Sequence, residues 1–371
     1  MDNKAIFFFG SSANIGLTTH FATQIVDMYQ YGMKEGWHVY LLSIVQEQNE
    51  GLWRRVEEHI PKEFIIKYDQ NSIHELNEKL LKKSLKYDRI VIHVQGISQL
   101  LSIKPLLLKS SITKVVTTIH AFANGVPYKR PIVSFIYTLL INKYVDKAIF
   151  LSPFAMRSFC GISYLLKKGK VAHIPFSLRS ELEVKKSENV FFDLDKFNII
   201  YLANFTKNKR HEHFLDPIIR FCHENPNVRV YFFGEGKQRE KVIRKVNLAK
   251  CEKQIYCPGR ISYDSVKTVL NFADLALNLS ASETAGHAIL EPVLHCIPLI
   301  ATRVGFAEYL LQDYITGYGI DSPYDLYCKL QYVFTHYDKA KSLARETKKI
   351  AMPLFDYRRM IQAYFELYNN L

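Results

Sequence analysis

Short apolar runs alternate with helix-sized segments along almost the whole chain. In the first half the apolar runs lie at residues 5–9, 38–42, 90–94, 115–119, 148–151 and 171–174. Segments long enough for a helix, such as residues 19–35, lie between them. Apolar runs of this kind are typical of parallel strands that helices cover on both faces. The first half therefore predicts a parallel α/β sheet.

A second series of apolar runs follows the polar stretch at residues 179–188. These runs lie at residues 198–202, 228–233, 254–257, 275–279 and 299–301. The chain has 371 residues, more than the roughly 250–300 that one hydrophobic core usually serves. We therefore expect two doubly wound α/β domains, and the default ligand site of such a pair is the cleft between them.

One apolar run is longer than the strands. Residues 132–141 lie between Arg130 and Lys143 and are too few to span a bilayer. We expect a core helix here, ahead of the strand at residues 148–151.

The segment at residues 280–310 carries the most informative chemistry. Ser282 and Thr284 offer helix caps ahead of an apolar run, and strands are expected before and after that run. Ligands of such βαβ units lie beyond the carboxyl ends of the strands. Free amides at the helix start attract an anion such as phosphate, and Gly286 allows a close approach to the backbone.

Two carboxylates flank this helix start. Glu291 lies within the helix, where it suits the hydroxyls of a ribose, and Glu283 precedes the helix and faces whatever is attached beyond the phosphates. Together they indicate a ligand that is linked to a nucleotide and carries hydroxyls at both ends. The alternative from the residues alone is two acidic side chains on a solvated helix and its loop.

This segment resembles the donor-site signature of retaining glycosyltransferases with the GT-B fold, family 4 (glycosyl transferases group 1). The matching positions are Glu283, Gly286, Glu291, Pro298 and residues 302–305. Further blocks that resemble the family recur in order at residues 15–20, 118–120, 174–175, 201–209 and 233–236.

The resemblance implies an α/β fold with two Rossmann-like doubly wound domains that face each other across a cleft, and a C-terminal helix that crosses back to the first domain. On that basis we expect an acceptor-binding domain at residues 1–176 plus 352–371, a linker at residues 177–196 and a donor-binding domain at residues 197–351.

The resemblance also assigns roles. It implies catalytic roles for His120 and Glu283, with His93 as a lesser candidate. It implies donor contacts from Asn204, Lys209, Gly234, Gly286, His287 and Glu291. It implies an acceptor or phosphate loop that includes Gly16, Thr19 and His20. The implied reaction transfers a hexose or N-acetylhexosamine from a nucleoside-diphosphate sugar, with retention, to a glycan or lipid-linked glycan acceptor.

Three positions depart from the family pattern. Ile15 replaces a glycine of the N-terminal loop, and Asn204 replaces the arginine that commonly contacts the diphosphate, which leaves Lys209 as the matching cation. Cys296 replaces a glycine after the helix. Because a Cβ in a left-handed cap costs about 1 kcal/mol, we expect a different helix end there.

The sequence indicates no metal and no cofactor beyond the sugar nucleotide as co-substrate. Its only short Asp-x-Asp, Asp193 to Asp195, lies in the expected linker, where a turn or cap is its expected role. The six cysteines all lie from Cys160 onward without a C-x-x-C pair, which argues against a disulfide framework or a zinc site.

The net charge of +13 requires anionic partners. Nucleotide-sugar phosphates fit, and an anionic membrane surface stays open because lysines cluster in the first half near residues 106–108, which are leucines. Nucleic acid is disfavoured, since no basic recognition helix stands out. The start of the chain lacks the layout of a signal peptide, so we expect a cytoplasmic protein, either free or peripheral on the inner face of the plasma membrane.

Two other functions stay open at this stage. One is a nucleotide-sugar epimerase of the same fold, which would need further acid and base groups. The other is a weakened or non-catalytic sugar-binding or chaperone subunit of a glycosyltransferase complex, which the departures at Ile15 and Asn204 keep open. Surface polysaccharide synthesis in a bacterium is the pathway class that the resemblance implies. The sequence indicates no oligomeric state.

Overall fold

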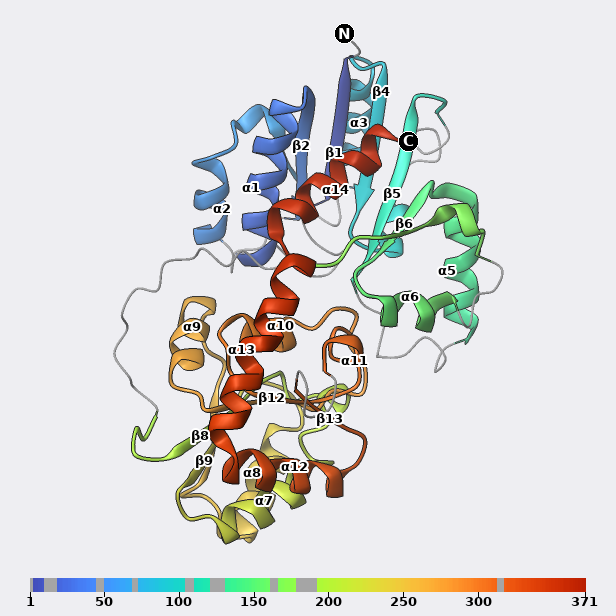
Figure 1. Ribbon diagram of the computed structural model, residues 1–371. Coiled ribbons are helices and arrows are strands. Elements are labelled where there is room, and N and C mark those ends of the chain that lie inside the picture. The colour runs from blue at the N-terminus through green and yellow to red at the C-terminus, as the bar shows by residue number, and fades with distance from the viewer. Residues whose placement is uncertain are drawn as a thin grey trace. The chain divides into compact units, whose positions relative to one another are not determined.

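The computed structural model describes residues 3–9, 19–44, 50–68, 73–103, 110–120, 131–160, 166–177, 192–311 and 317–371. Within these ranges parallel strands alternate with helices as far as Ile320, and three helices follow (Figure 1). This is the alternation that the apolar pattern predicts.

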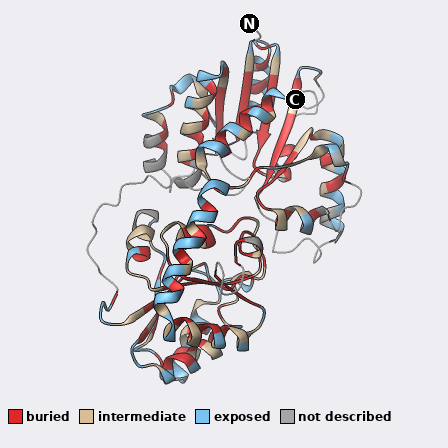
Figure 2. Ribbon diagram, in the orientation of Figure 1, coloured by how far each residue is buried: buried red, intermediate tan, exposed pale blue. Residues whose placement is uncertain are grey.

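The strands are the most buried parts of the molecule (Figure 2). In β11 (Leu275–Asn278) and β12 (Leu299–Thr302) every residue is buried. Strands with no solvated face carry apolar side chains on both faces, so their sequence shows a continuous run rather than an alternation.

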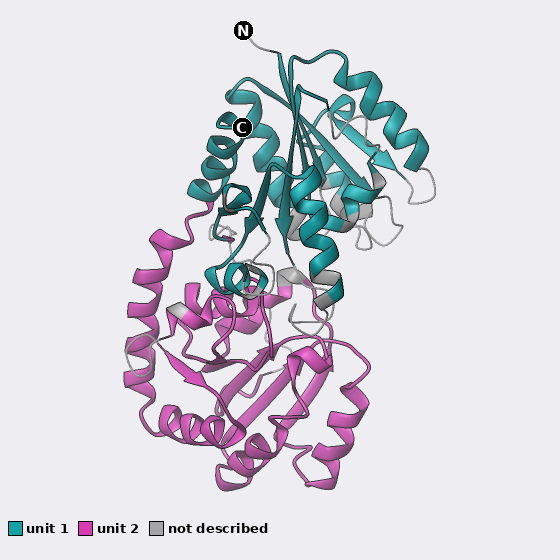
Figure 3. Ribbon diagram, turned by 90° about the vertical axis from the view of Figure 1, so that its right-hand side faces the viewer, with its two compact units in different colours: residues 1–175, 358–371 teal, residues 176–357 magenta. Residues whose placement is uncertain are grey.

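The chain forms two compact units, each of which is described by itself (Figure 3). Unit 1 comprises Met1–Pro175 and Arg358–Leu371, and unit 2 comprises Phe176–Tyr357.

Unit 1 contains a parallel sheet of seven described strands in the order β3-β2-β1-β4-β5-β6-β7. Their bounds are β1 Lys4–Phe9, β2 Trp37–Ile44, β3 Ile65–Tyr68, β4 Arg89–Val94, β5 Thr113–Ile119, β6 Lys147–Phe150 and β7 Val171–His173. The described helices are α1 Thr19–Lys34, α2 Glu50–Glu57, α3 Ile73–Ser84, α5 Pro131–Tyr144, α6 Pro153–Cys160 and α14 Tyr357–Asn369, with short 3-10 turns at Lys62–Phe64, Ile97–Ser102 and Lys168–Lys170.

The C-terminal helix α14 packs within unit 1, as the sequence predicts. Arg89 of β4 donates hydrogen bonds from Nη2 to the carbonyl oxygens of Tyr368 and Asn369, at 2.8 and 2.9 Å. These bonds satisfy carbonyls that the end of a helix leaves without a partner. Phe365 lies close to Gly32 of α1, where an added Cβ would come within 2.9 Å of the phenylalanine ring.

Unit 2 contains a parallel sheet of six described strands in the order β10-β9-β8-β11-β12-β13. Besides β11 and β12 these are β8 Phe197–Leu202, β9 Val228–Phe233, β10 Ile255–Gly259 and β13 Tyr318–Ile320. The helices are α7 Leu215–Glu224, α8 Arg239–Leu248, α9 Tyr263–Asn271, α10 His287–Leu294, α11 Ala307–Leu310, α12 Pro323–Thr335 and α13 Tyr337–Leu354, with a 3-10 turn at Lys207–Lys209.

Each strand expected from the sequence is present, and the α/β fold with two parallel sheets is confirmed. The pattern missed β3 and β13. Both are short edge strands, and β13 has three residues with glycine at its centre. An edge strand needs less apolar surface than a central one, so its run is too short to stand out.

Helix α5 corrects the expectation of a core helix at residues 132–141. Ile141 is fully buried, but Ile132, Phe135, Ile136 and Leu139 are exposed. The helix therefore buries one face and leaves an apolar face in solvent.

The end of α10 corrects a second expectation. Cys296 has φ of 57° and adopts the left-handed conformation that glycine would take. The amide of Ile297 donates to the carbonyl of Pro292 at 2.9 Å and the amide of Cys296 donates to that of Val293 at 3.1 Å. These bonds close the helix end in the usual way and offset the cost of the Cβ.

Candidate functional site

The site in unit 2 lies where the strand order reverses. β8 pairs with β9 on one side and with β11 on the other, so the connections on its two sides run in opposite directions. In open α/β sheets this reversal leaves a crevice beyond the carboxyl ends of the two strands. The loop after β8 carries Asn204 and Lys209, and the loop after β11 carries Glu283 and Gly286.

Hydrogen bonds join these two loops directly. The amide of Ala281 donates to the carbonyl of Asn208 at 2.7 Å, and Asn208 Nδ2 donates to the carbonyl of Ser282 at 3.0 Å. Beside these bonds the Lys209 ammonium forms an ion pair with the Glu283 carboxylate. The structure therefore brings together two residues that lie 74 positions apart in the sequence.

This ion pair is partly buried. The Lys209 and Glu283 side chains are 23% and 15% exposed. Charges held at this depth keep more of their mutual attraction than a solvated pair does. The two charges of the pair neutralise each other. A bound diphosphate would compete with Glu283 for the Lys209 ammonium.

A third loop supports this arrangement from β12. Thr302 Oγ1 donates to the carbonyl of Ser280 at 2.6 Å, and the amide of Phe306 donates to the carbonyl of Ala285 at 3.0 Å. Gly305 has φ of 59°, and an added Cβ would lie 2.5 Å from the Ala285 carbonyl oxygen. The backbone that carries Glu283 is therefore fixed on two sides.

Gly286 begins α10 with φ of 98°. An added Cβ would lie 2.6 Å from Ile289 Cδ1, so both the backbone conformation and the packing call for glycine. The carbonyl of Gly286 accepts the amides of Ile289 and Leu290. Amides in the first turn of a helix point along the helix axis toward its start and are suited to an anion, and His287 and Ala288 occupy this turn of α10.

His287, the first residue of α10, stacks on Phe176 with ring centroids 4.3 Å apart and ring planes 14° apart. His287 is exposed by surface area, yet desolvation by nearby protein lowers its pKa to about 4, against a smaller opposing effect of the Glu283 charge. The ring is therefore neutral near pH 7. It can share a hydrogen bond with a ligand but adds no positive charge to a phosphate site.

Glu291 lies one turn further along α10. Desolvation raises the pKa of its carboxyl group to about 7. Among the residues that the structure describes, none forms a hydrogen bond or ion pair with this carboxylate. In contrast to Glu283, its carboxylate accepts from no donor in the described ranges, which suits the hydroxyl pair of a ribose.

Asn204 and Gly234 tie β8 to β9. Asn204 is exposed, and its Oδ1 accepts the amide of Glu235 at 3.3 Å. Gly234 has φ of 141°, and an added Cβ would lie 2.3 Å from the Ala203 carbonyl oxygen. Both residues shape the loop that carries Lys209, and their donor contacts stay a prediction.

In unit 1 the described site residue is His120, which directly follows β5. Its Nε2 shares a hydrogen bond with Oε1 of Gln95, which directly follows β4. A carboxamide oxygen only accepts, so this bond places the proton on Nε2. The backbone amide of Gln95 donates to Gln99 Oε1 at 2.7 Å, and this bond fixes the position of Gln95.

His93, the lesser candidate, is a structural residue. It is fully buried in β4, its Nε2 shares a 2.7 Å hydrogen bond with Thr118 Oγ1 and its Nδ1 shares one with the Tyr368 hydroxyl of α14. Burial lowers its pKa to about 3. The neutral ring therefore links α14 to the sheet.

The predicted N-terminal loop is only partly described. Gly16 lies outside the described residues, as does Ile15. Thr19 and His20 begin α1, and nothing is described of their side chains. The predicted role of this loop stays a prediction.

Sequence reasoning missed two residues of these sites, Asn208 and Gln95. Asn208 lay inside the block at residues 201–209, but nothing in the sequence showed that it bonds to the Ser282 carbonyl. Gln95 could have been found, because it follows an apolar strand as His120 does.

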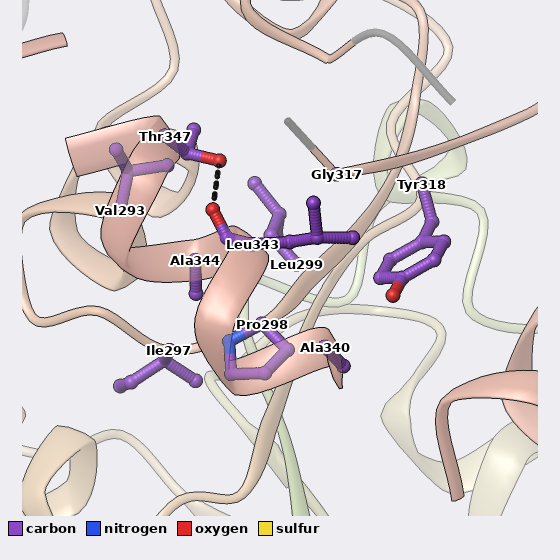
Figure 4. Close-up of a pocket in the computed structure, with 10 residues that line it drawn as sticks. All are labelled: Val293, Ile297, Pro298, Leu299, Gly317, Tyr318, Ala340, Leu343, Ala344 and Thr347. Atoms are coloured by element: carbon purple, nitrogen blue, oxygen red, sulfur yellow. Dashed lines mark hydrogen bonds between the residues drawn. The ribbon is translucent and has the colours of Figure 1, made fainter. Parts of the chain in front are cut away.

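An enclosed pocket of unit 2 lies away from this site (Figure 4). It lies between α10, β12, β13 and α13, where Val293, Leu299 and Ala344 help to line it. Its volume of about 10 Å³ is close to that of a single water site. It is a packing defect rather than a ligand site.

The Asp193 to Asp195 segment forms a turn, in which Asp193 Oδ1 accepts the amide of Asp195 at 3.2 Å. In the described part of the chain no group of three or more His, Cys, Asp and Glu side chains has the spacing of a metal site. None of the described helices is both long and apolar enough to span a bilayer.

Comparison with known proteins supports the predicted resemblance. The family model described as glycosyl transferases group 1 matches residues 184–350, which cover nearly all of unit 2. This match supports the predicted resemblance to group 1 for unit 2, and the solved structures below confirm the predicted two-domain fold.

Two curated proteins show similarity over part of the chain. N-acetyl-alpha-D-glucosaminyl L-malate synthase of Bacillus anthracis is 27% identical over 141 residues, which cover 38% of this chain and 34% of that protein. Alpha-monoglucosyldiacylglycerol synthase of Acholeplasma laidlawii is 26% identical over 119 residues, which cover 32% and 30%. The aligned part thus spans about a third of each relative.

The whole chain has structural neighbours. HepE of Anabaena, solved in complex with UDP-glucose, covers 99% of this chain and 100% of its own with a TM-score of 0.79 and 17% identity. Sucrose-phosphate synthase of Thermosynechococcus elongatus has a TM-score of 0.75 and 14% identity and covers 99% of this chain and 98% of its own. At these identities the likeness establishes the fold.

Proposed function

We propose that this protein is a retaining glycosyltransferase that moves a hexose or N-acetylhexosamine from a nucleoside-diphosphate sugar to a glycan or lipid-linked glycan acceptor. The observation that carries the proposal is the arrangement in unit 2. A paired Lys209 and Glu283 lie on two joined loops, and the second of these loops leads through Gly286 into α10, whose Glu291 has no described partner.

Each part of the donor binds to a different group of this site. The diphosphate faces the amides at the start of α10 and the Lys209 ammonium, which together stabilise the charge that develops as it leaves. Glu291 accepts hydrogen bonds from the ribose. Glu283, released from Lys209, contacts the transferred sugar.

The reaction breaks the bond between the anomeric carbon and the diphosphate oxygen. A bond forms from the anomeric carbon to an acceptor oxygen on the same face, and the acceptor proton passes to the leaving diphosphate. His120, whose Nε2 proton is fixed by Gln95, keeps its predicted role toward the donor sugar. The reaction needs no bound metal ion, because Lys209 and the helix start balance the charge.

The comparisons support UDP as the first nucleotide to test, because HepE was solved with UDP-glucose. Both curated relatives are named for alpha-linked products, the outcome expected when an alpha-linked nucleotide sugar reacts with retention. We place the enzyme in the cytoplasm, at the inner face of the plasma membrane, in the synthesis of bacterial surface polysaccharide.

Isothermal titration with UDP and GDP, followed by a mass-spectrometric screen of donor sugars against a lipid-diphosphate sugar primer, tests the proposal. We expect micromolar binding of one nucleotide and a product whose mass increases by one sugar. Nucleotide binding without turnover for any pair would favour a non-catalytic subunit instead. No nucleotide binding would remove the proposed donor site.

A chelator tests the proposed independence from metal ions. Turnover should be unchanged in EDTA. Activity that EDTA abolishes and Mg²⁺ or Mn²⁺ restores would show that a metal ion, and not Lys209 with the helix start, balances the diphosphate charge.

A further inference from the structure

Helix α5 of unit 1 exposes a continuous apolar stripe. Ile132 is 75% exposed, and Phe135, Ile136 and Leu139 are each close to half exposed. Their spacing of three, four and seven residues places them on one face of the helix. The exposed residues of α5 stand out in pale blue in Figure 2.

The helix is firmly held on its other face. Thr138 and Ile141 are buried, and Ile141 belongs to the hydrophobic core of the unit. The stripe is therefore presented by a packed helix. Single exposed apolar residues are ordinary, but four on one helix face form a patch of the kind that marks an interaction surface.

The charged groups at the C-terminal end of α5 are mostly cationic. Lys143 is exposed on the helix itself. The exposed Lys167 is tied to the helix, because its amide donates to Asn142 Oδ1 at 3.2 Å. Lys170 Nζ donates to the carbonyls of Ile141 and Val145 at the helix end.

The helix itself carries no carboxylate that could balance Lys143 and Lys167. The sequence of α5, PIVSFIYTLLINKY, contains no Asp or Glu. Asp146, which follows the helix, accepts the amide of Val115 with its Oδ2 at 2.8 Å, and its charge acts on Lys170. The surface therefore combines an apolar stripe with a cationic end.

We propose that α5 is a docking helix for an anionic lipid bilayer, with the apolar stripe inserted among the lipid chains and Lys143 and Lys167 against the headgroups. A helix of this kind lies in the plane of the membrane interface and binds through apolar burial together with attraction to anionic lipid. A protein surface would need a complementary acidic rim, whereas an anionic bilayer offers negative charge all along the helix. The inference deepens the membrane part of the proposed function by naming the surface and the lipid class.

Co-sedimentation with vesicles tests the proposal. The full chain should bind vesicles of phosphatidylcholine with about one-third phosphatidylglycerol, and bind pure phosphatidylcholine at least about fivefold more weakly. The double variant Ile132→Ser, Ile136→Ser should lose binding to both. The double variant Lys143→Glu, Lys167→Glu should lose the preference for phosphatidylglycerol.

Leu248 provides a matched control. It is 84% exposed at the end of α8 in unit 2, and no cationic apolar stripe is described around it. Leu248→Ser should leave vesicle binding unchanged. Circular dichroism of each variant checks that it is folded.

Three outcomes would overturn the proposal: no vesicle binding by the wild-type chain, equal binding by wild type and the serine double variant, or light scattering that shows a dimer which the serine variant dissociates. UDP titration without vesicles separates this proposal from the donor site. Intact UDP binding with no lipid binding would remove only the docking helix, and the reverse would remove only the donor site.

Discussion

The two sheets share the same strand order, apart from one further edge strand, β7, in unit 1, but they carry different chemistry near the point where that order reverses. In unit 1 the order reverses between β1 and β4, and the described side chains near this point include Gln95 after β4 and His120 after the neighbouring β5. In unit 2 the order reverses between β8 and β11, which lead to Lys209 and Glu283, and these two side chains are charged and paired. Topology fixes where loops gather, and the side chains on those loops decide what can bind there.

The difference suits a division of labour. The charged pair of Lys209 and Glu283 in unit 2 lies on loops next to the start of α10, and this region is suited to an anionic diphosphate. The described groups of unit 1 are an amide and an imidazole, which share hydrogen bonds and suit hydroxyl groups instead. The comparison therefore predicts that substitutions among the charged groups of unit 2 change nucleotide binding or turnover, while substitution of Gln95 in unit 1 changes turnover and leaves nucleotide binding unchanged.

The largest effect is expected from Gly234, the glycine that directly follows β9. Gly234→Ala should destabilise unit 2 by about 3 kcal/mol or more, because its φ of 141° is unfavourable for alanine and the new Cβ would meet the Ala203 carbonyl at 2.3 Å. Gly96 of unit 1 has φ of 136° but no atom within 4 Å of an added Cβ, so Gly96→Ala should cost only about 1–2 kcal/mol.

Urea unfolding can follow each unit separately. Both tryptophans, Trp37 and Trp53, belong to unit 1, so their fluorescence reports that unit, while far-ultraviolet circular dichroism reports both. Gly234→Ala should change the circular dichroism transition and leave fluorescence unchanged. Gly169→Ala is the control, since nothing lies within 4 Å of its added Cβ. Equal losses at Gly96 and Gly234 would contradict the steric argument.

Glu291→Gln should stabilise unit 2 at high pH. The folded pKa is about 7, above the ordinary 4.5, so the folded protein resists ionisation and the wild type loses stability as pH rises from about 4.5 to above 7. A difference of about 2.5 between the two pKa values corresponds to about 3 kcal/mol. The neutral variant avoids this loss and should be more stable at pH 8 but not at pH 4.5.

The same variant should bind UDP more weakly, by about 1.5–3 kcal/mol, if the carboxylate accepts ribose hydrogen bonds. Thermal unfolding at the two pH values and isothermal titration measure both effects. A variant that gains stability but keeps its UDP affinity would show that burial destabilises the ionised Glu291 and that this residue has no role at the ribose.

Glu283→Gln should lower turnover by about 10- to 150-fold, which corresponds to the 1.5–3 kcal/mol of a charged hydrogen bond. Its effect on UDP affinity should be smaller, because Glu283 contacts the sugar and the variant frees Lys209 for the phosphate. Steady-state kinetics and UDP titration give the two values. The variants Glu283→Gln, Lys209→Met and their combination form a cycle, in which losses that simply add would show that the ion pair is not coupled.

Tyr368→Phe should destabilise unit 1 by about 1–2 kcal/mol, because it leaves Nδ1 of the buried His93 without its partner. Tryptophan fluorescence during urea unfolding measures the loss. Tyr256→Phe is a control in unit 2, since the Tyr256 hydroxyl bonds to the Lys253 carbonyl at the surface. Burial lowers the pKa of His93 to about 3, so the folded unit resists protonation of this ring. We therefore also expect unit 1 to lose stability as pH falls below about 6.5.

The smallest effect is expected at Gln95. Gln95→Leu removes the acceptor of the His120 Nε2 proton and should lower turnover by about three- to tenfold with UDP affinity unchanged. Gln95→Glu places a negative charge beside the imidazole and raises the pKa of His120, so the acidic limb of the pH–rate profile should move to higher pH. An unchanged profile would mean that His120 does not act in the reaction.

The extent to which sequence predicted these elements depends on burial. Central strands such as β1 and β11 are covered on both faces and show as continuous apolar runs. The edge strands β3 and β13 were missed because they require little apolar surface. The sequence predicts a core helix at α5, because an apolar run looks the same whether the rest of the protein covers one face of the helix or both.

Cys296 shows a limit of a different kind. Its residue type predicts a changed helix end, yet the backbone adopts the left-handed conformation with its capping hydrogen bonds intact. A local preference of about 1 kcal/mol is smaller than the sum of those bonds and the packing around them.

By itself the sequence determined two parallel α/β units, the donor-type segment around Glu283 and the glycine that begins α10, because apolar runs and turn residues act over a few neighbouring positions. Tertiary structure alone decided that Lys209 pairs with Glu283, that Gln95 fixes His120, that Glu291 lacks a described partner and that α5 shows its apolar face to solvent. These features depend on contacts between residues distant in the chain, and on which surfaces are left uncovered once the sheets have formed. No local pattern of residues predicts these distant contacts or these uncovered surfaces.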